Sequence, residues 1–433
     1  MRAKSFVGAL AVALALGAGA ASAQAAPTVC SSGCAYTGIQ AAINGAASGS
    51  TITVGPGNYY ENVVVDKSVT LRGSGALTIV YPAVSKPVCE GGSLCGGEAS
   101  NIVLVQADNV TISRMWLRGD NPSLTSGVVV GGEDIDARNG IITDHETGVY
   151  NNLTVTGVKV TGVYLRGIYA SSGGSFNFNH DTVENVQGSE SSIAMFAFEG
   201  TGVMERNHVS EANDALSANW SKGIQFLYNV VKKSGSGLHT DNNGGSGGSA
   251  DLIKGNIVRE CKPNGYGVFV FVPYVSPTVE GNHITGCAVG LAAFGSAVSG
   301  QGATFSGNSA SGVGAVTTGG EPTYGAYLTT DQLGYAFGDL SATLTGNVLH
   351  GFGTGLLVTQ TSPTAGQPAG GQATVHAAGN NSLFGDGTGA NGLPGTVVEA
   401  QNDWWGCPTG PNTKRCTTAV GTVQFTPWLT AKP

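Results

Sequence analysis

An asparagine recurs at nearly constant spacing through the middle of the chain, and this repeat limits the possible folds more than any other feature. Its successive steps are 22, 27, 26 and 26 residues. A period of about 20 to 50 residues indicates a solenoid, a propeller or another array. The repeated positions are Asn207, Asn229, Asn256, Asn282 and Asn308, and the register returns at Asn347 after a longer insertion.

The repeat unit consists of short β-branched runs separated by Gly, Asn and Ser. It is too short for a strand–helix–strand unit and has no helical period, so it fits one coil of a solenoid. Stacking would bring equivalent residues to about 4.8 Å from one another. With 41% hydrophobic residues the chain can bury a core, and its 69 glycines show no collagen period. We expect the repeated Asn to be structural, because its amide can bond to the next coil.

Two of the eight cysteines follow the repeat. Cys261 lies five residues after Asn256, and Cys287 lies five after Asn282. They should face each other on adjacent coils within disulfide reach, with a column of reduced thiols as the alternative. The spacing of the other six suggests local pairs, Cys30–Cys34, Cys89–Cys95 and Cys407–Cys416. Metal sites would need closely spaced Cys pairs or interleaved His, so we predict no metal site.

Residues 1–25 differ in composition from the rest. They contain basic residues at positions 2 and 4, an apolar stretch from 6 to 16 and two Ala-x-Ala sites. This is typical of a secretory signal peptide, with a retained membrane anchor as the alternative. We therefore expect a secreted monomer, extracellular, periplasmic or at the cell surface, without a membrane span after signal removal. The net charge of −8 and the lack of a basic run argue against a nucleic-acid partner.

Both ends of the chain carry further motifs. Residues 51–61 contain Thr-Ile-Thr-Val, Pro-Gly, Tyr and Glu, and residues 402–406 read Asn-Asp-Trp-Trp-Gly. With the repeat, these motifs resemble the right-handed parallel β-helix proteins of the pectin lyase-like superfamily. The resemblance implies an all-β, right-handed parallel β-helix (solenoid) with a short N-terminal capping helix near 37–48. The expected units are a signal peptide (1–25), an N-terminal cap and helix (26–50), parallel β-helix coils (51–400) and a C-terminal closing segment (401–433).

In that family the Asn ladder lies between the second and third strands of each coil, and the first strand lines the substrate groove. The resemblance makes the segment nine to twelve residues after each Asn the first strand. Its inward column would hold Leu216, Leu238, Val268, Leu291 and Leu356. Because side chains alternate along a strand, the next residue and the one two beyond it point outward. The outward pairs are Ser217/Asn219, His239/Asp241, Phe269/Phe271 and Ala292/Phe294.

We predict a polysaccharide site on this outward face. His239 and Asp241 offer proton transfer, and Asp214 would reach in from the adjoining turn, so these three are the candidate catalytic residues. The candidate substrate-binding residues are Phe269, Phe271, Asn219 and Phe294. In the alternative interpretation, loops cover the rings and the polar groups only bond locally. The carboxylates could form an acid–base pair, hold calcium or face water, so calcium is the one cofactor left open.

A second acidic group lies between positions 133 and 146, and consists of Glu133, Asp134, Asp136, Asp144, His145 and Glu146. Its spacing does not match a calcium loop, so a solvated loop is expected, with a cation site as the alternative. Residues 142–145 resemble the Trp-Ile-Asp-His of pectate lyases, but the motifs of pectin methylesterases, polygalacturonases and alginate epimerases are absent. An acidic protein repels polyuronates unless calcium or a local basic patch intervenes, so neutral or partly esterified glycans are at least as plausible.

The predicted function is that of a secreted β-helix protein that binds an extracellular polysaccharide and, if it is an enzyme, depolymerises it as a lyase or hydrolase. The alternative is a non-catalytic surface or adhesion-type β-helix protein. A concave pocket shared by His239, Asp241 and Asp214 would favour the enzyme.

Overall fold

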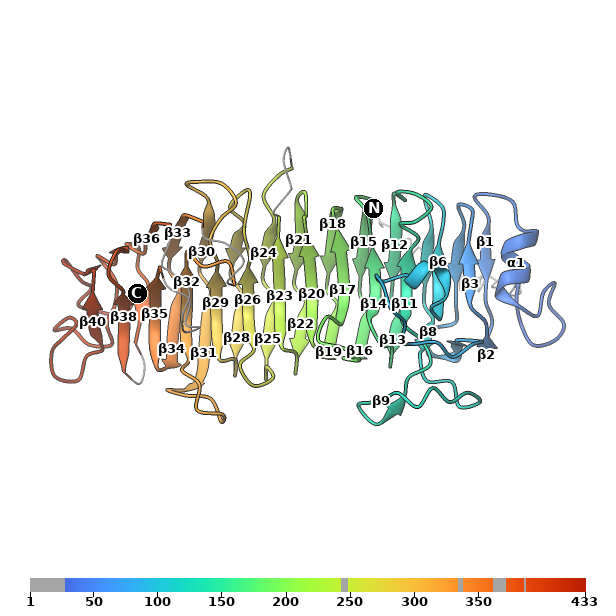
Figure 1. Cartoon of the computed structure of the whole chain (residues 1–433), viewed down its shortest axis with the longest axis horizontal. Coiled ribbons are helices and arrows are strands. Elements are labelled where there is room, and N and C mark those ends of the chain that lie inside the picture. Colours follow the sequence, from blue (N-terminus) through green and yellow to red (C-terminus); the bar gives the residue numbers. More distant parts are fainter. Residues whose placement is uncertain (1–27, 243–247, 334–337, 361–370, 385–386) are drawn as a thin grey trace, which may run out of the picture.

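Three long parallel sheets form the body of the molecule (Figure 1). The computed structural model describes residues 28–242, 248–333, 338–360, 371–384 and 387–433, and the signal peptide predicted at 1–25 lies outside them. Each coil adds one strand to each of three sheets, which we number I, II and III in chain order. Strands in the same sheet pair in parallel with the coils before and after them. The predicted all-β solenoid is therefore confirmed.

Sheet I has 14 strands and precedes the Asn turn in each coil. Its strands are β1 (Thr51–Thr53), β4 (Thr70–Arg72), β7 (Thr111–Ser113), β12 (Leu153–Thr156), β15 (Ser175–Asn179), β18 (Thr201–Glu205), β21 (Ile224–Leu227), β24 (Leu252–Lys254), β27 (Thr278–Glu280), β30 (Gly302–Ser306), β33 (Leu340–Thr345), β36 (Ala373–His376), β39 (Val397–Glu399) and β41 (Val423–Gln424).

Sheet II has 12 strands and follows the Asn turn. Its strands are β2 (Gly57–Tyr60), β5 (Thr78–Tyr81), β8 (Trp116–Arg118), β13 (Lys159–Thr161), β16 (Thr182–Val186), β19 (His208–Ala212), β22 (Val230–Lys232), β25 (Ile257–Arg259), β28 (His283–Thr285), β31 (Ser309–Gly314), β34 (Val348–Phe352) and β37 (Ser382–Leu383).

Sheet III has 13 strands and carries the predicted site. Its strands are β3 (Val63–Val65), β6 (Asn101–Val105), β11 (Asn139–Thr143), β14 (Arg166–Ala170), β17 (Ile193–Phe198), β20 (Asp214–Asn219), β23 (Ser236–Asp241), β26 (Tyr266–Val270), β29 (Val289–Ala293), β32 (Tyr324–Thr329), β35 (Thr354–Thr359), β38 (Thr388–Gly392) and β40 (Thr418–Gly421). A small hairpin, β9 (Val129–Val130) with β10 (Glu133–Asp134), projects from the body (Figure 1).

The repeated asparagines form one buried ladder at the turn between sheets I and II. In the Asn229 rung, Nδ2 donates to Oδ1 of Asn256 at 2.9 Å and to the carbonyl of Met204 at 2.9 Å. The same pattern continues through Asn347 and Asn381. The predicted structural role of the repeat is confirmed, because each amide bonds the coils on both sides of it.

The helix α1 (Ile39–Gly45) lies at one end of the solenoid (Figure 1). It is shorter than the predicted segment 37–48. The carboxylate of Glu61 accepts hydrogen bonds from the backbone N–H groups of Ile39 and Gln40, both at 2.8 Å. The side chain of Gln40 in turn bonds both backbone groups of Val64 in β3. The motif glutamate therefore caps the helix, and the helix covers the first strand of sheet III.

The inward column of sheet III is buried as predicted, and it joins the single apolar core that fills the solenoid. All four predicted disulfides form, including the bridge between adjacent coils, Cys261–Cys287. At the C-terminal end, fully buried Trp405 contacts Phe425 edge-on at 6.2 Å. Strand β40 of sheet III and strand β41 of sheet I lie beyond position 400, so these two sheets continue into the predicted closing segment. The boundaries of the predicted units stay a prediction. No helix in the described part of the chain is long and apolar enough to cross a membrane.

Candidate active site

The outer face of sheet III carries polar side chains between two aromatic groups. The first, which we call the N-terminal aromatic cluster, is Leu94, Ile142, Tyr169, Ile193 and Phe196. The second, the C-terminal aromatic cluster, is Phe269, Val289, Ala292, Phe294 and Tyr327. The strand register places Ser217 and His239 between them, in the column that runs from Phe196 to Phe269. Between Phe196 and Phe269 this column holds only Ser217 and His239, and both can form hydrogen bonds. Apolar surface thus lies on either side of them.

His239 is held by hydrogen bonds on one side of its ring. Its Nδ1 lies 3.0 Å from Oδ2 of Asp214 and 3.2 Å from Oγ of Ser217. The ring meets Phe269 edge-on, with centroids 4.7 Å apart. Ser217 also donates to Oδ1 of Asn219 at 2.9 Å. The carboxylate therefore orients the imidazole, and the aromatic neighbour fixes its plane.

A pocket of about 380 Å³ opens at this pair, and we call it the site pocket. Asp214, His239, Tyr266 and Phe269 line it together with Glu190 from a neighbouring loop. Burial raises the pKa of Tyr266, so its phenol is protonated at neutral pH. The pocket thus combines a carboxylate–imidazole pair, a second carboxylate and an aromatic wall.

The geometry excludes a serine-hydrolase triad. In such a triad the serine and the acid bond opposite nitrogen atoms of the histidine. Here Ser217 and Asp214 share Nδ1, while Nε2 is buried and has no partner among the described residues. The pair suits general acid–base work instead, once the ring turns or its cover moves so that substrate reaches Nε2.

Lys262 braces the rim of the site pocket. Its Nζ donates to Oε1 of Gln187 at 2.8 Å and to Oδ1 of Asn213 at 2.7 Å. Asn213 itself lines the pocket, directly before Asp214. Burial lowers the pKa of Lys262. This lysine ties together two loops that lie one coil apart and sets the shape of the pocket mouth.

Two polar residues lie elsewhere than expected. Asp214 is the first residue of β20, not part of the adjoining turn, because the sheet III ladder already pairs it with Ile193 and Ser236. Asp241 is buried and does not line the site pocket, because it points outward one column further along β23. The pocket therefore unites two of the three candidate catalytic residues.

The predicted phenylalanine platform is largely covered. Phe294 is 1% exposed and Phe269 is 9% exposed, because the rings of the C-terminal aromatic cluster pack on one another at 4.8 Å. Phe271 is half-buried and stacks on Phe269. The exposed ring beside this face is Trp220, which is 43% exposed and stacks on Phe198 at 5.9 Å. The expectation that Phe269 and Phe294 form an open ridge is wrong.

No protein-family model and no curated protein sequence matches the chain. Among solved structures, a tailspike protein of E. coli bacteriophage HK620 in complex with pentasaccharide is similar over 89% of this chain and 76% of that chain. It has a TM-score of 0.52 and 14% sequence identity. The chain is a right-handed parallel β-helix protein of the pectin lyase-like fold.

Two further solved structures resemble this β-helix more loosely. A DFA-IIIase from Arthrobacter chlorophenolicus A6, without its lid, has a TM-score of 0.46 and 13% identity over 86% of this chain and 88% of that chain. The A-module of a mannuronan C-5 epimerase from Azotobacter vinelandii has a TM-score of 0.45 and 14% identity over 91% and 94%. At such identities the likeness concerns the fold.

Three residues of the β-helix site were not predicted. Tyr266 lies two positions before the inward Val268, so alternation along the strand would place it on the inner face, although it lines the site pocket. Trp220 directly follows the outward Asn219, at the end of β20. Glu190 comes from a loop whose path the repeat does not determine. Alternation therefore predicts none of the three: it assigns Tyr266 to the other face, Trp220 lies beyond the end of β20, and Glu190 lies in a loop.

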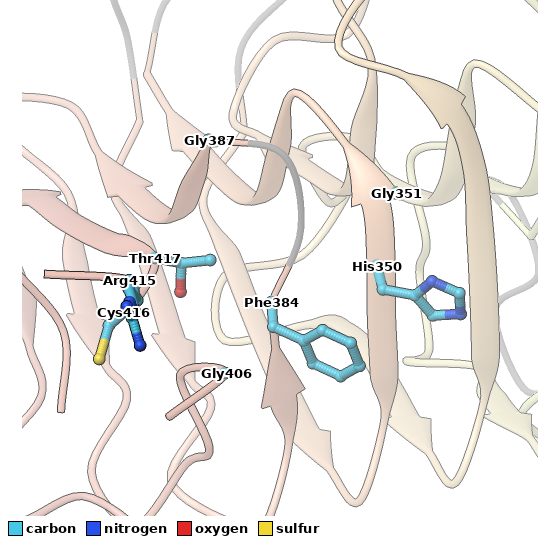
Figure 2. A pocket seen from close by; sticks show the side chains of 8 residues that line it. All are labelled: His350, Gly351, Phe384, Gly387, Gly406, Arg415, Cys416 and Thr417. Carbon is cyan, nitrogen blue, oxygen red and sulfur yellow. The ribbon is translucent and has the colours of Figure 1, made fainter. Parts of the chain in front are cut away.

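Another cavity of the β-helix, of about 550 Å³, lies near the C-terminal end. Figure 2 shows the rings of His350 and Phe384 side by side and Arg415 apart from them; the two rings stack at 5.5 Å. No Asp or Glu is among the described residues that line this cavity. It therefore offers no acid–base pair, and we place the candidate site in the site pocket.

No group of three or more ligand-type side chains suited to a metal lies within the described ranges. In the acidic stretch 133–146 the carboxylates bond to their surroundings. Asp134 accepts from Ser126, Asp136 accepts from the backbone of Asn121, and Asp144 accepts from Gln106 at 2.6 Å. These contacts hold loops in place, but Asp136 and Asp144 are buried, so the expectation of a solvated loop is wrong for these two residues.

Proposed function

We propose that this β-helix binds a polysaccharide along the outer face of sheet III and cleaves it in the site pocket. The observation that carries the proposal is the 3.0 Å contact between Nδ1 of His239 and Oδ2 of Asp214 in a pocket with an aromatic wall. A tailspike protein in complex with pentasaccharide shares the fold, which is consistent with a carbohydrate ligand.

Two cleavage mechanisms fit the groups in the site pocket. In hydrolysis, one carboxylic acid protonates the leaving oxygen and a second group activates water, roles open to Asp214 and Glu190. In elimination, a base removes the proton next to a sugar carboxyl group, the glycosidic C–O bond breaks as the double bond forms, and the leaving oxygen takes up a proton. His239 oriented by Asp214 is the candidate base. The reaction products separate the two, since elimination alone leaves an unsaturated sugar end.

A non-catalytic binding protein is the second candidate. It is favoured by the covered state of Phe269 and Phe294 and by the burial of Nε2 of His239. In that case the exposed Trp220 and the half-buried Phe271 would contact the glycan, and Asp214 and His239 would only stabilise the sheet face.

The deciding experiment is a polysaccharide panel incubated with the wild-type protein and with His239→Ala, with and without calcium. Reducing ends and unsaturated ends are measured in parallel. New chain ends that appear with the wild type and not with the variant support the catalytic proposal. The non-catalytic alternative is supported if the wild type binds a glycan but produces no new chain ends from any glycan, with or without calcium.

We further propose that the protein is exported. The four disulfides support this, because such bonds persist in oxidising compartments. The N-terminal residue of the protein recovered outside the cytoplasm tests it: cleavage near position 25 is expected, and an intact N-terminus would contradict the signal peptide.

A further inference from the structure

A second pocket, of about 340 Å³, lies near the N-terminal aromatic cluster, and two arginines line it. We call it the arginine pocket. Its walls come from the loop 88–93, from residues 164–166 and from Ser189 and Ser191. Ser189 and Ser191 flank Glu190, which lines the site pocket, so one short loop separates the two pockets.

Arg138 is fully engaged with the wall of this pocket. It donates from Nε to the carbonyl of Ser93 at 3.1 Å and from Nη1 to that of Pro87 at 3.2 Å. Its Nη2 reaches the carbonyls of Gly91 and Gly92. These contacts hold the loop that the Cys89–Cys95 disulfide closes. Arg138 therefore builds the pocket and keeps its charge there, without a carboxylate partner among the described residues.

Arg166 is the guanidinium with unused hydrogen-bonding capacity. It is 9% exposed, and only its Nη1 donates to described residues, the carbonyls of Leu165 and Ser191. Its Nε is buried without a partner, and Nη2 donates to no described group. Its plane lies against the ring of Phe196 at 4.9 Å. Burial lowers the pKa of Arg166 to about 10, so it stays charged at neutral pH.

Arg166 forms no ion pair with a described residue, although the negative charge of Asp214 acts on it at longer range. A buried charge without a direct ionic partner is costly, and further negative charge nearby relieves the cost. Guanidinium groups match the two oxygens of a carboxylate or of a sulfate ester. Arg166 pairs with Ile193, and Ile193 pairs with Asp214, so the arginine lies two coils from the site pocket. Two coils measure about 10 Å along the solenoid axis, a distance that neighbouring sugars of one chain can span.

We infer that the arginine pocket is a subsite for an oxyanion of the glycan, a carboxylate or a sulfate half-ester, so that the polysaccharide is acidic. The location on a glycan rests on the proposed function, whereas the capacity to bind an oxyanion does not. A protein with a net charge of −8 is expected to repel an acidic glycan. The two arginines reduce this repulsion locally, because they place positive charge on the side that faces the ligand.

The test uses the full chain and hexasaccharides of one backbone: a uronate form, the same form with its carboxyl groups reduced to alcohols, and a sulfated form. Binding is measured by calorimetry for the wild type, for Arg166→Gln and for Arg166→Met, which keeps the length of the side chain. The exposed Arg259 of β25 provides the matched control, Arg259→Gln.

We expect the wild type to bind one acidic form at least about 10-fold more tightly than the reduced form. Both Arg166 variants should lose this preference to within about 2-fold while they keep their affinity for the reduced form, and Arg259→Gln should keep the preference. A preference for the uronate form indicates a carboxylate subsite, and a preference for the sulfated form indicates a sulfate subsite. Equal binding of all three forms by the wild type, or a preference that survives in both Arg166 variants, would overturn the inference and leave the proposed function intact.

Failure of every glycan to bind would count against the proposed function. The oxyanion site is then tested independently of any glycan, with inorganic sulfate. Inorganic sulfate at rising concentration should raise the thermal unfolding midpoint of the wild type more than that of Arg166→Met. Equal shifts for the two proteins would overturn the oxyanion site as well.

Discussion

At the scale of the residue, the imidazole of His239 depends on Asp214 for its orientation. The carboxylate lies at 3.0 Å from Nδ1, and the opposite nitrogen has no described partner. The acid thus fixes which nitrogen stays unpaired, and this nitrogen can serve as a base once it is uncovered.

We expect His239→Ala to lower turnover by about 100-fold or more, the scale of a lost general acid or base, with little change in folding stability. Asp214→Asn should also lower turnover, because the imidazole loses its negatively charged acceptor. Steady-state rates on a degraded glycan measure both. Asp241→Asn is the comparison: since Asp241 does not line the site pocket, its turnover should stay within about 3-fold of the wild type.

The two kinds of aromatic residue on this face should respond differently to truncation. Trp220→Ala should weaken glycan binding by about 3- to 10-fold without loss of stability, because its ring is 43% exposed. Phe269→Ala should instead lower the free energy of unfolding by about 3 kcal/mol, because it removes a ring from a packed cluster. Calorimetric binding and thermal unfolding distinguish the two. A stable Phe269→Ala protein with lost binding would restore the open-ridge interpretation.

The outward direction of His239 and Phe269 could be predicted, since alternation along a strand depends only on the backbone. The covered state of Phe294 could not, because it results from contacts with Phe269 and Tyr327 on other coils. The absence of Asp241 from the pocket likewise depends on loops. Position along the strand therefore determines the face, and long-range packing decides which side chains on that face are accessible.

At the scale of the element, the Asn ladder ends in an aspartate on each side. Asp181 donates its N–H to Oδ1 of Asn207, and Asp403 accepts from Nδ2 of Asn381 at 3.1 Å. The Oδ2 atom of each is buried and has no described partner. A protonated carboxyl group can donate a hydrogen bond from this oxygen, as the amide Nδ2 of asparagine does. Protonated Asp181 and Asp403 therefore have the same donor and acceptor arrangement as an asparagine of the ladder.

Burial raises the pKa of Asp181 to about 8 and that of Asp403 to about 7. The folded chain therefore holds these protons more tightly than the unfolded chain, and the free energy of unfolding should fall as pH rises from about 4 to about 8. Asp181→Asn should raise the unfolding midpoint at pH 8 more than at pH 5. Exposed Asp66→Asn should leave the pH dependence unchanged, and an equal gain at both pH values would contradict the protonated state.

The disulfide between coils should stabilise more than the short-range ones. Cys261–Cys287 closes 26 residues, whereas Cys30–Cys34 closes 4. In the chain-entropy model this corresponds to about 3 against about 2 kcal/mol. Paired Cys→Ala variants, compared by denaturant unfolding, measure the two contributions. A larger loss from the Cys30–Cys34 variant would show that native-state contacts outweigh loop closure.

At the scale of the whole molecule, the solenoid follows from the period of the repeat, because only stacked coils place every Asn in one column. The extra rungs at Asn381 and Asp403 were not predicted, since insertions interrupt the spacing there. The arginine pocket was beyond prediction too, because it is built by loops that leave the repeat. The period of the repeat predicts the positions only of residues that belong to the repeat.

The covered N-terminal end of this solenoid has a consequence for self-association. A stack of parallel coils has an unpaired strand edge at each end, onto which a second molecule could add its own coils without limit. Gln40 occupies both backbone groups of Val64, and Glu61 holds the helix that carries it. Glu61→Ala should therefore release a growing edge, seen as fibres by electron microscopy, while the wild type stays dispersed at the same concentration. In this molecule one helix of 7 residues stands between a finite particle and a polymer.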